Sequence, residues 1–196
     1  MSPPRHTFAD VTAARPRAVE LRPVDRNLFR TLLHQQASTV TVVTAVAPGS
    51  RPSCLGDLGE PLRTGFTATS FTSVSLDPPL VSFCLGVDSS SWTVLARAEH
   101  VAVHLLAADQ TEAARVFATN GIDRFAAYPG WTPGPFGVPL LGGVLASLLC
   151  RVVHRVPAGD HNVVIAEPLA LSGGAGGEPL VHHRGGYTTT ASAVAA

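Results

Sequence analysis

The chain has 196 residues, which suits a single domain, and 45% of them are hydrophobic, enough to bury a sizeable core. The formal net charge is +0 at pH 7, which excludes the broad basic field of a typical nucleic-acid-binding protein. The 14 basic residues are all arginine, so any anionic ligand must be held by arginine, hydroxyl groups or backbone amides.

The three cysteines, Cys54, Cys84 and Cys150, are scattered and form no CxxC motif, a pattern typical of reduced thiols. The N-terminal residues lack the apolar segment of a signal peptide. No stretch reaches membrane-spanning length without polar interruption. We therefore expect a cytoplasmic protein that does not interact with a membrane.

Residues 1–23 mix prolines and arginines without a hydrophobic period, so we expect a flexible N-terminal arm. The predicted domain covers 24–187, and a C-terminal tail covers 188–196. Asp25 is the expected N-cap of a short amphipathic helix that ends near Gln36.

Runs of β-branched and apolar residues predict strands along most of the remaining chain. The expected strands cover 38–47, 64–70, 80–86, 101–107, 144–156, 161–171 and 179–187. Segments rich in glycine and proline predict loops at 48–63 and 129–143 and a turn at 173–177.

Two further helices are predicted between the strands. A short one lies within 88–98 and is opened by Asp88 or a serine. A second covers 109–118, where Asp109 is the expected N-cap and Glu112 completes a capping box.

The predicted strands do not alternate strictly with helices, and no GxGxxG motif follows the first strand. A parallel dinucleotide-binding fold is therefore disfavoured. A mainly β protein built as a small antiparallel barrel fits the pattern better.

The segment 65–86 carries hydroxyl groups at nearly every other position of its first half. Thr67, Thr69 and the serines of 70–75 could bind the edge of a flat polar ring and a phosphate at its end. The alternative is a strand edge with exposed threonine and serine, which is common because threonine favours strands.

Three other stretches could meet a ligand. The "DSSSW" segment at 88–92 offers hydroxyls at a helix start, although ordinary N-capping is the commoner explanation of such a segment. Asp160 and His161 stand at the mouth of a strand, where a solvated turn is the alternative interpretation. In "HHRGGY", Arg184 offers a planar fork for phosphate or carboxylate and Tyr187 a flat face, unless they form only a final turn.

No metal site is expected, because the adjacent His182 and His183 would point to opposite faces of a strand. The sequence has no GxSxG motif and no paired carboxylate site. Any chemistry would therefore belong to a cofactor.

Together these stretches resemble the flavin reductases of two-component flavin monooxygenases, which share the FMN-binding split barrel. The matching segments keep their order over most of 26–187. They are "STVTVVTA", "GFTATSFTSVSLDPPLVSFCL", "SSSW", "HVAVHLLAADQTEAARVFA", "F…PLLGGVLASLLCRV", "GDHNVVIAE" and "PLVHHRGGY".

The resemblance implies an antiparallel Greek-key split β-barrel with a few short flanking helices, forming a homodimer with flavin near the subunit interface. It also implies an NAD(P)H:flavin oxidoreductase of EC 1.5.1 type. Such an enzyme transfers hydride from NADH or NADPH to a dissociable FMN or FAD and supplies reduced flavin to a partner monooxygenase. The two reacting rings should stack with their reacting atoms about 3–3.5 Å apart.

By the same resemblance, Thr67, Ala68, Thr69 and Ser70 line the isoalloxazine ring and the ribityl chain, and Ser73 and Val74 lie near the phosphate end. The residues expected to flank the phosphate or the adenosine part are Ser89, Ser90 and Trp92. His161 would be the catalytic-site residue at the nicotinamide, in a positioning role, with Arg184 and Tyr187 near the cofactor or the nucleotide.

Two alternatives stay open. The barrel could retain its flavin and reduce another acceptor, or it could be a non-catalytic module that binds flavin or haem. Binding of nucleic acid is disfavoured by the neutral charge and by an aromatic content of 6%.

Overall fold

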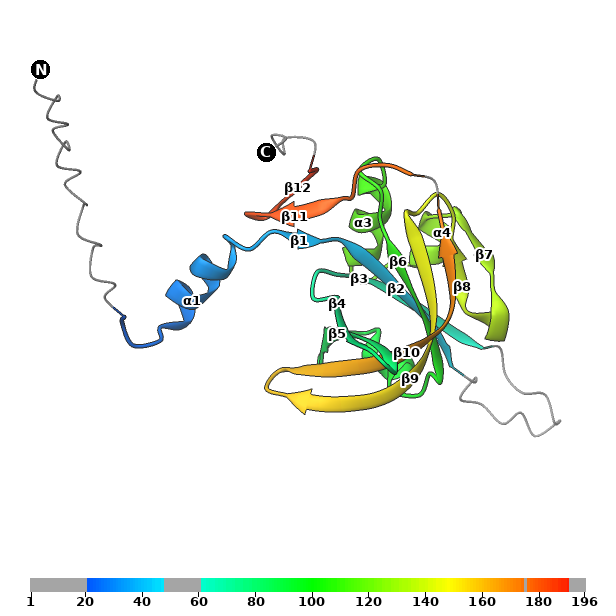
Figure 1. The fold of residues 1–196 in the computed structure, drawn as a ribbon, viewed down its shortest axis with the longest axis horizontal. Coiled ribbons are helices and arrows are strands. Elements are labelled where there is room, and N and C mark those ends of the chain that lie inside the picture. The colour runs from blue at the N-terminus through cyan, green and yellow to red at the C-terminus, as the bar shows by residue number, and fades with distance from the viewer. Residues whose placement is uncertain (1–20, 48–60, 175, 191–196) are drawn as a thin grey trace, which may run out of the picture.

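A curled, seven-stranded antiparallel sheet dominates the computed structural model, which describes residues 21–47, 61–174 and 176–190 (Figure 1). In spatial order its strands are β3 (Leu62–Ala68), β2 (Thr41–Ala47), β6 (His100–Leu105), β9 (Ala146–Ala158), β10 (His161–Gly173), β5 (Pro79–Gly86) and β4 (Thr72–Leu76). The non-sequential order and the antiparallel pairing confirm the predicted Greek-key architecture.

The sheet closes on itself because its two edge strands are neighbours in the sequence. β3 ends at Ala68 and β4 begins at Thr72, so the chain between them spans at most about 14 Å. The two edges of the sheet must therefore approach each other, although no β3–β4 ladder joins them. The result is a barrel with an open seam, as the prediction of a split barrel requires.

Two smaller sheets and five short helices surround the barrel (Figure 1). The sheets are β1 (Ser38–Thr39) with β11 (Val181–His183) and β12 (Gly186–Thr188), and β7 (Trp131–Pro133) with β8 (Pro139–Leu141). The helices are α1 (Arg26–Leu33), α2 (Trp92–Leu95), α3 (Thr111–Ala118), α4 (Arg124–Ala127) and the 3₁₀ turn η1 (Pro135–Gly137).

Apolar side chains fill the barrel and also cover its outer face under α3. The inner cluster includes Val43, Phe66, Phe83, Val103 and Val164. The outer cluster consists of Val40, Val42, Leu106, Ala113, Ala114, Phe117, Leu141, Val144 and Leu180. Because β2 contributes to both clusters, nearly all its residues are buried, which explains why its sequence shows no alternation of apolar and polar residues.

Contacts between α3 and β3 depend on a glycine. A Cβ atom at Gly65 would lie 2.6 Å from Cε1 of Phe117, so only glycine lets this ring rest directly on the strand. Beside it, the Thr67 hydroxyl donates a hydrogen bond to the carbonyl of Ala114 at 2.7 Å. These two contacts fix α3 against the edge strand.

His104 on β6 is the largest buried polar side chain among the residues that the structure describes. Its Nε2 accepts a hydrogen bond from the N–H of Leu141 at 3.1 Å, so Nδ1 must carry the proton that it donates to the carbonyl of Val42 at 3.0 Å. Burial lowers the pKa of His104 from 6.5 to about 4, and the hydrogen bond to Val42 opposes this shift. The imidazole is therefore a neutral structural link between strands at pH 7.

The first predicted helix is confirmed at its start, because the Asp25 carboxylate accepts a hydrogen bond from the N–H of Leu28 at 2.9 Å. The predicted capping box at 109–118 is wrong. α3 begins at Thr111 with Gln110 as N-cap, and the Gln110 side chain bonds to backbone groups of Ala107 and Gly142 instead.

Three other segments differ from the sequence prediction. The predicted loop at 129–143 contains the paired strands β7 and β8, and the single strand predicted at 179–187 is a hairpin of β11 and β12. The structure also adds β4 and the short helix α4, which the sequence pattern did not predict.

Several predictions concern residues outside the described part of the chain. These are the arm at 1–20, residues 48–60 of the expected loop, Cys54 and the last residues of the tail, 191–196. Among the described helices, none is both long enough and apolar enough to cross a bilayer.

Candidate functional site

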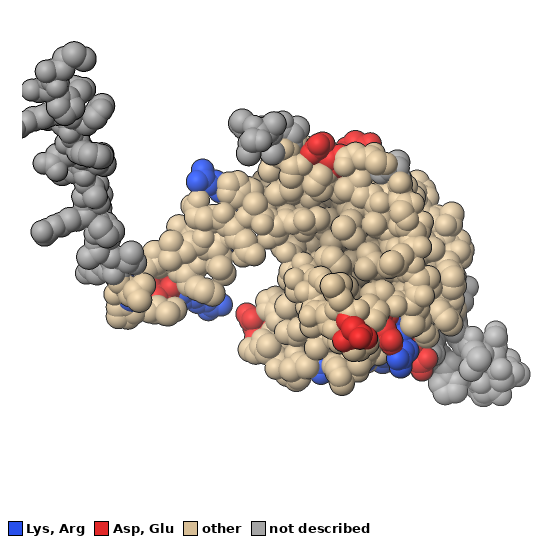
Figure 2. Space-filling view, viewed as in Figure 1, with Lys and Arg blue, Asp and Glu red and all other residues tan. Residues whose placement is uncertain are grey.

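A cleft of about 760 Å³ lies between helix α1 and one end of the barrel. Figure 2 shows it as a hollow, with basic atoms on the α1 arm facing acidic atoms on the barrel. We call it the α1 cleft. Its lining residues are Arg26, Phe29, Arg30, Leu33, His34, Gln36, Ser38, Thr69, Ser70, Asp160, His161, His182 and Arg184. Four predicted site residues, Thr69, Ser70, His161 and Arg184, therefore converge there from three parts of the chain.

The turn between β9 and β10 supplies Asp160 and His161. It is made possible by Gly159, which has a φ of 64°. The Asp160 carboxylate lies 2.7 Å from Nδ1 of His161, and both side chains are exposed. The hydrogen bond from His161 lowers the pKa of Asp160, and the charges of His161 and Arg26 contribute further. With Nδ1 held by the carboxylate, Nε2 of His161 is left to face a ligand.

The turn between β3 and β4 supplies Thr69 and Ser70 at the barrel seam. The Ser70 hydroxyl accepts a hydrogen bond from the N–H of Cys84 on β5 at 2.9 Å. This bond extends the β4–β5 pairing by one more pair of residues and fixes the turn. Thr69 is exposed beside it, so its hydroxyl can meet a ligand in the cleft.

Arg184 and Gly185 form the tight turn between β11 and β12, with φ angles of 51° and 80°. Positive φ is common for glycine and uncommon for arginine. Two bonds support this conformation: the backbone N–H of Arg184 donates to the carbonyl of His34, and its guanidinium donates to Oε1 of Gln35 at 2.8 Å. The turn therefore holds the Arg184 side chain against the segment that follows α1.

Helix α1 brings two arginines that the sequence analysis did not select. Arg26 and Arg30 are one helical turn apart and line the cleft with Arg184, whereas Asp160 is its single acidic residue. The excess of positive charge suits an anionic ligand. Their spacing of four residues was the available signal, but an arginine pair on an amphipathic helix usually only faces solvent.

The other predicted residues lie outside the α1 cleft. The Thr67 hydroxyl is directed to α3, Ala68 is buried, and Tyr187 packs edge-on to His182 with 5.8 Å between ring centroids. Ser73 and Val74 are exposed on edge strand β4, where the register shifts between Ser73 and Ser75.

Ser89, Ser90 and Trp92 belong to the turn that follows β5, which we call the serine turn (87–91), and to the start of α2. The N–H of Val87 donates to the carbonyl of Asp160 at 3.0 Å, so this turn begins directly beside the β9–β10 turn. Trp92 packs against the core inside the barrel. The predicted helix is present, but α2 has only four residues. Its N-cap residue, Ser91, makes no side-chain capping bond.

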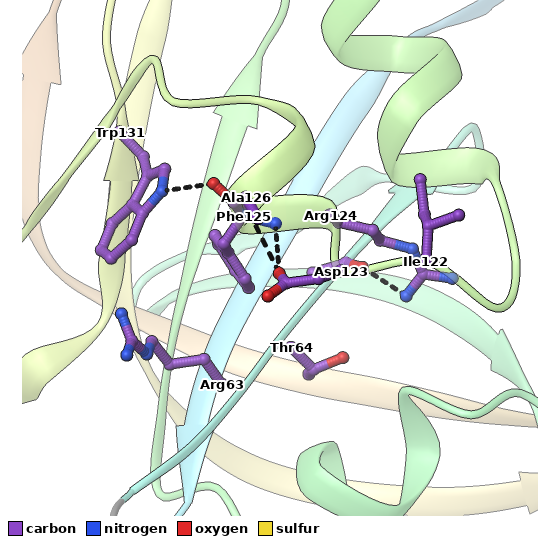
Figure 3. A pocket seen from close by; sticks show the side chains of 9 residues that line it. Arg63, Thr64, Ile122, Asp123, Arg124, Phe125, Ala126 and Trp131 are labelled. Atoms are coloured by element: carbon purple, nitrogen blue, oxygen red, sulfur yellow. Dashed lines mark hydrogen bonds between the residues drawn. The ribbon is translucent and has the colours of Figure 1, made fainter.

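A second cleft, of about 480 Å³, lies where β3 meets α4, and the sequence analysis missed it entirely. We call it the Arg63 cleft. Its lining residues are Arg63, Thr64, Gly65, Ile122, Asp123, Arg124, Phe125, Ala126 and Trp131. In Figure 3, Arg63 and Trp131 lie at one end, Arg124 and Ile122 at the other, and Asp123 between them.

Hydrogen bonds make the Arg63 cleft rigid. Asp123 caps α4 by accepting from the N–H groups of Phe125 and Ala126, and Nε1 of Trp131 donates to the carbonyl of Phe125 at 3.1 Å (Figure 3). Arg124 donates to the carbonyl of Gly65 at 2.9 Å and to the hydroxyl of Ser91 at 3.0 Å. Burial lowers the pKa of Arg124.

Known proteins are similar to this chain in both sequence and fold. The model of the "Flavin reductase like domain" family matches residues 33–191. The reductase subunit HsaB of a flavin-dependent monooxygenase from Rhodococcus jostii (strain RHA1) is 35% identical over 171 residues, covering 87% of this chain and 81% of its own. An NADH:riboflavin 5'-phosphate oxidoreductase from Streptomyces pristinaespiralis is 38% identical over 164 residues, covering 82% and 86%.

A solved structure agrees with these relatives. The NADH:FAD oxidoreductase SgcE6 of Streptomyces globisporus C-1027, in complex with NAD and FAD fragments, superposes with a TM-score of 0.75 at 32% identity. The match covers 91% of this chain and 100% of that one. The Greek-key split barrel, the ordered motifs and these similarities lead to one conclusion: the chain belongs to the flavin reductase like domain family.

Proposed function

We propose that this protein is an NAD(P)H:flavin oxidoreductase that reduces FMN or FAD and supplies free reduced flavin to a partner monooxygenase. The observation that carries the proposal is the convergence of Thr69, Ser70, His161 and Arg184 on one cationic cleft. The relatives support it, since their names describe NADH:flavin oxidoreductases and reductase subunits of monooxygenases.

The α1 cleft fits an anionic dinucleotide. Its volume of about 760 Å³ lies within the usual range of small-molecule sites, about 300–1,000 Å³. Arg26, Arg30 and Arg184 can neutralise phosphate charge, and Phe29 and Leu33 offer apolar surface to a flat ring. We assign this cleft to the nicotinamide nucleotide and to the ring end of the flavin.

The seam of the barrel fits the flavin itself. The β3–β4 turn presents the Thr69 hydroxyl and turn backbone, and the Ser70 bond to Cys84 holds that turn in place. Thr67, Ala68, Ser73 and Val74 complete the proposed surroundings of the ring and its phosphate end. A bound flavin supplies the electron acceptor, because it takes up a hydride from a reduced nicotinamide.

His161 is proposed to position the nicotinamide rather than to transfer a proton. Hydride transfer itself needs no protein base. The Asp160 carboxylate fixes the imidazole through Nδ1, so Nε2 can donate or accept one directed hydrogen bond. Ser89, Ser90, Trp92 and Tyr187 are assigned supporting contacts to the phosphate or the nucleotide.

We also propose that the protein acts as a cytoplasmic homodimer and is an EC 1.5.1-type enzyme. None of the α1 residues is buried, and Leu28, Phe29, Leu32 and Leu33 are exposed. An eight-residue helix is not stable alone in water, so its apolar face needs a covering surface. A second copy of the chain supplies that surface in the proposed dimer.

An anaerobic assay tests the function. The protein is mixed with NADH or NADPH and with FMN, FAD or riboflavin, and oxidation of the nucleotide is followed by absorbance. We expect turnover with at least one pair, and release of reduced flavin in a stopped-flow trap experiment. Flavin should also be lost on dialysis, as micromolar affinity requires. If no pair reacts, or if the flavin stays bound through turnover, the proposed function is wrong.

A further inference from the structure

We propose that Gln35 is a positioning residue. Its neutral amide holds the Arg184 guanidinium at the α1 cleft and leaves the positive charge of that guanidinium for the diphosphate of the nicotinamide nucleotide. The inference rests on the proposed function, because it assigns how Arg184 meets the anionic part of that substrate. Gln35 does not line the cleft, so it acts through Arg184 and not on the ligand itself.

The hairpin of β11 and β12 carries Arg184 to the end of α1 (Figure 1). β1 pairs with β11, with Ser38 opposite His182, so the turn of the hairpin reaches back towards the residues that follow α1. There the backbone N–H of Arg184 donates to the carbonyl of His34 at 3.2 Å. Two segments far apart in the sequence therefore lie together in the lining of the cleft.

The conformation of Arg184 is unusual for an arginine. Its φ of 51° and the φ of 80° at Gly185 are those of a two-residue hairpin turn, in which asparagine and glycine are the favoured residues. A long side chain is disfavoured in this left-handed region, because its Cβ atom crowds the backbone. Strained residues of this kind are typical of functional sites, so the turn indicates a role for the guanidinium beyond closing the hairpin.

Gln35 holds the guanidinium by one edge. Its Oε1 accepts hydrogen bonds from Nε of Arg184 at 3.2 Å and from Nη2 at 2.8 Å. Because arginine has only donors, the atom of Gln35 that faces it must be the amide oxygen. Within the described part of the chain, Nη1 of Arg184 has no hydrogen-bond acceptor. The second edge of the guanidinium is therefore left for an anion in the cleft.

A neutral partner orients an arginine without cancelling its charge. Among the residues that the structure describes, no carboxylate lies within ion-pair distance of Arg184. A glutamate at position 35 would reach the same two N–H groups, but it would place a negative charge beside the phosphate. Charge-assisted bonds between guanidinium and phosphate are about twice as strong as neutral ones, so this charge is what the ligand needs. Glutamine provides the orientation and preserves the charge.

The test is steady-state oxidation of NADH or NADPH, whichever the enzyme accepts, at saturating flavin. The variants are Gln35→Glu, Gln35→Met and the control Arg22→Gln. The control changes the net charge by the same amount as Gln35→Glu, at an exposed position outside the cleft lining. We expect Gln35→Glu to raise the KM for the nucleotide about five- to tenfold and Gln35→Met about two- to threefold. The kcat should stay within about twofold in both variants, and Arg22→Gln should match the wild type.

Urea unfolding separates positioning from a structural role. A glutamate keeps the contact with Arg184, so Gln35→Glu should be as stable as the wild type, whereas Gln35→Met should be less stable. A merely structural role would give the opposite order of KM values, with little effect of Gln35→Glu and a larger effect of Gln35→Met. That order would overturn the proposal. An unchanged effect of Gln35→Glu on KM in an Arg184→Ala background would overturn it too.

Binding of pyrophosphate to the intact protein, measured by isothermal titration calorimetry, makes the test independent of turnover. We expect Gln35→Glu to raise the Kd for pyrophosphate about five- to tenfold, and Arg22→Gln to leave it unchanged. Equal binding by the wild type, Gln35→Glu and Arg184→Ala, or no binding by the wild type, would overturn the proposal. A protein that oxidises no nucleotide but gives the expected pyrophosphate constants would refute the reductase function alone.

Discussion

His104 links the stability of the fold to pH. The imidazole is completely buried and is held neutral by its two backbone hydrogen bonds. Its pKa is about 4 in the folded protein and 6.5 in the reference state, so only the unfolded chain binds a proton between these values. Stability is therefore full above pH 6.5 and falls as the pH drops towards 4. A shift of this size corresponds to about 3 kcal/mol, most of which is lost by pH 4.5.

Urea unfolding of the wild type and of His104→Gln at pH 7.0, 6.0, 5.0 and 4.5 measures this effect. Glutamine can offer a donor and an acceptor but does not titrate, so the variant should lose about 1–3 kcal/mol at pH 7 and have a much flatter pH dependence. His154→Gln, at an exposed position on β9, is the matched control and should keep the wild-type slope. Parallel pH curves for the wild type and His104→Gln would refute the reasoning.

Three further changes test the site and the fold. Replacing His161 with alanine removes the proposed contact to the nicotinamide, so the KM for the nucleotide should rise about tenfold in steady-state assays; unchanged KM and kcat would contradict the role. Leu32→Asp places a charge on the exposed face of α1, and light scattering should show monomers in place of dimers. Gly65→Ala should lower unfolding free energy by about 1–3 kcal/mol, since its Cβ would meet Phe117 at 2.6 Å, whereas Gly173→Ala, with no atom within 4 Å, should not.

The sequence predicted most of the barrel because its strands carry local signals. The β-branched run at 38–47 and the apolar runs at 80–86 and 101–107 correspond to β2, β5 and β6 within a few residues. Because these strands follow one another in a fixed order along the chain, only a few arrangements of paired strands are possible. The resemblance to flavin reductases supplied the Greek-key order, which periodicity alone does not determine.

Tertiary contacts explain the errors in local structure. Gln110 stands at the N-cap of α3 in place of Asp109, and its side chain donates to the carbonyl of Gly142, a residue far along the chain. The strands β7 and β8 are short and rich in proline, and they pair only because a turn brings Trp131 opposite Leu141. Neither contact can be recognised from a short stretch of the amino-acid sequence.

The candidate site was predicted in part because some of its residues lie in motifs that carry local signals. The motifs around Thr69, His161 and Arg184 stand out locally, and the structure brings these three residues to one cleft. Arg26 and Arg63 gave no such signal, because a single exposed arginine is usually a solvated surface group. The structure alone shows what lies near them, Asp160 in one cleft and Trp131 in the other.

The position of both clefts follows from the way this barrel closes. The edge strands β3 and β4 are joined by a three-residue turn but share no ladder, and backbone groups along such a seam lack strand partners. In this chain the Ser70–Cys84 bond fixes one end of β3, and the bond between Arg124 and Gly65 fixes its middle. The remaining polar groups along the seam are satisfied by water or by a ligand. A dissociable anion that binds at the seam could use these groups without any change in the fold, which is the physical basis for proposing the seam as the flavin site.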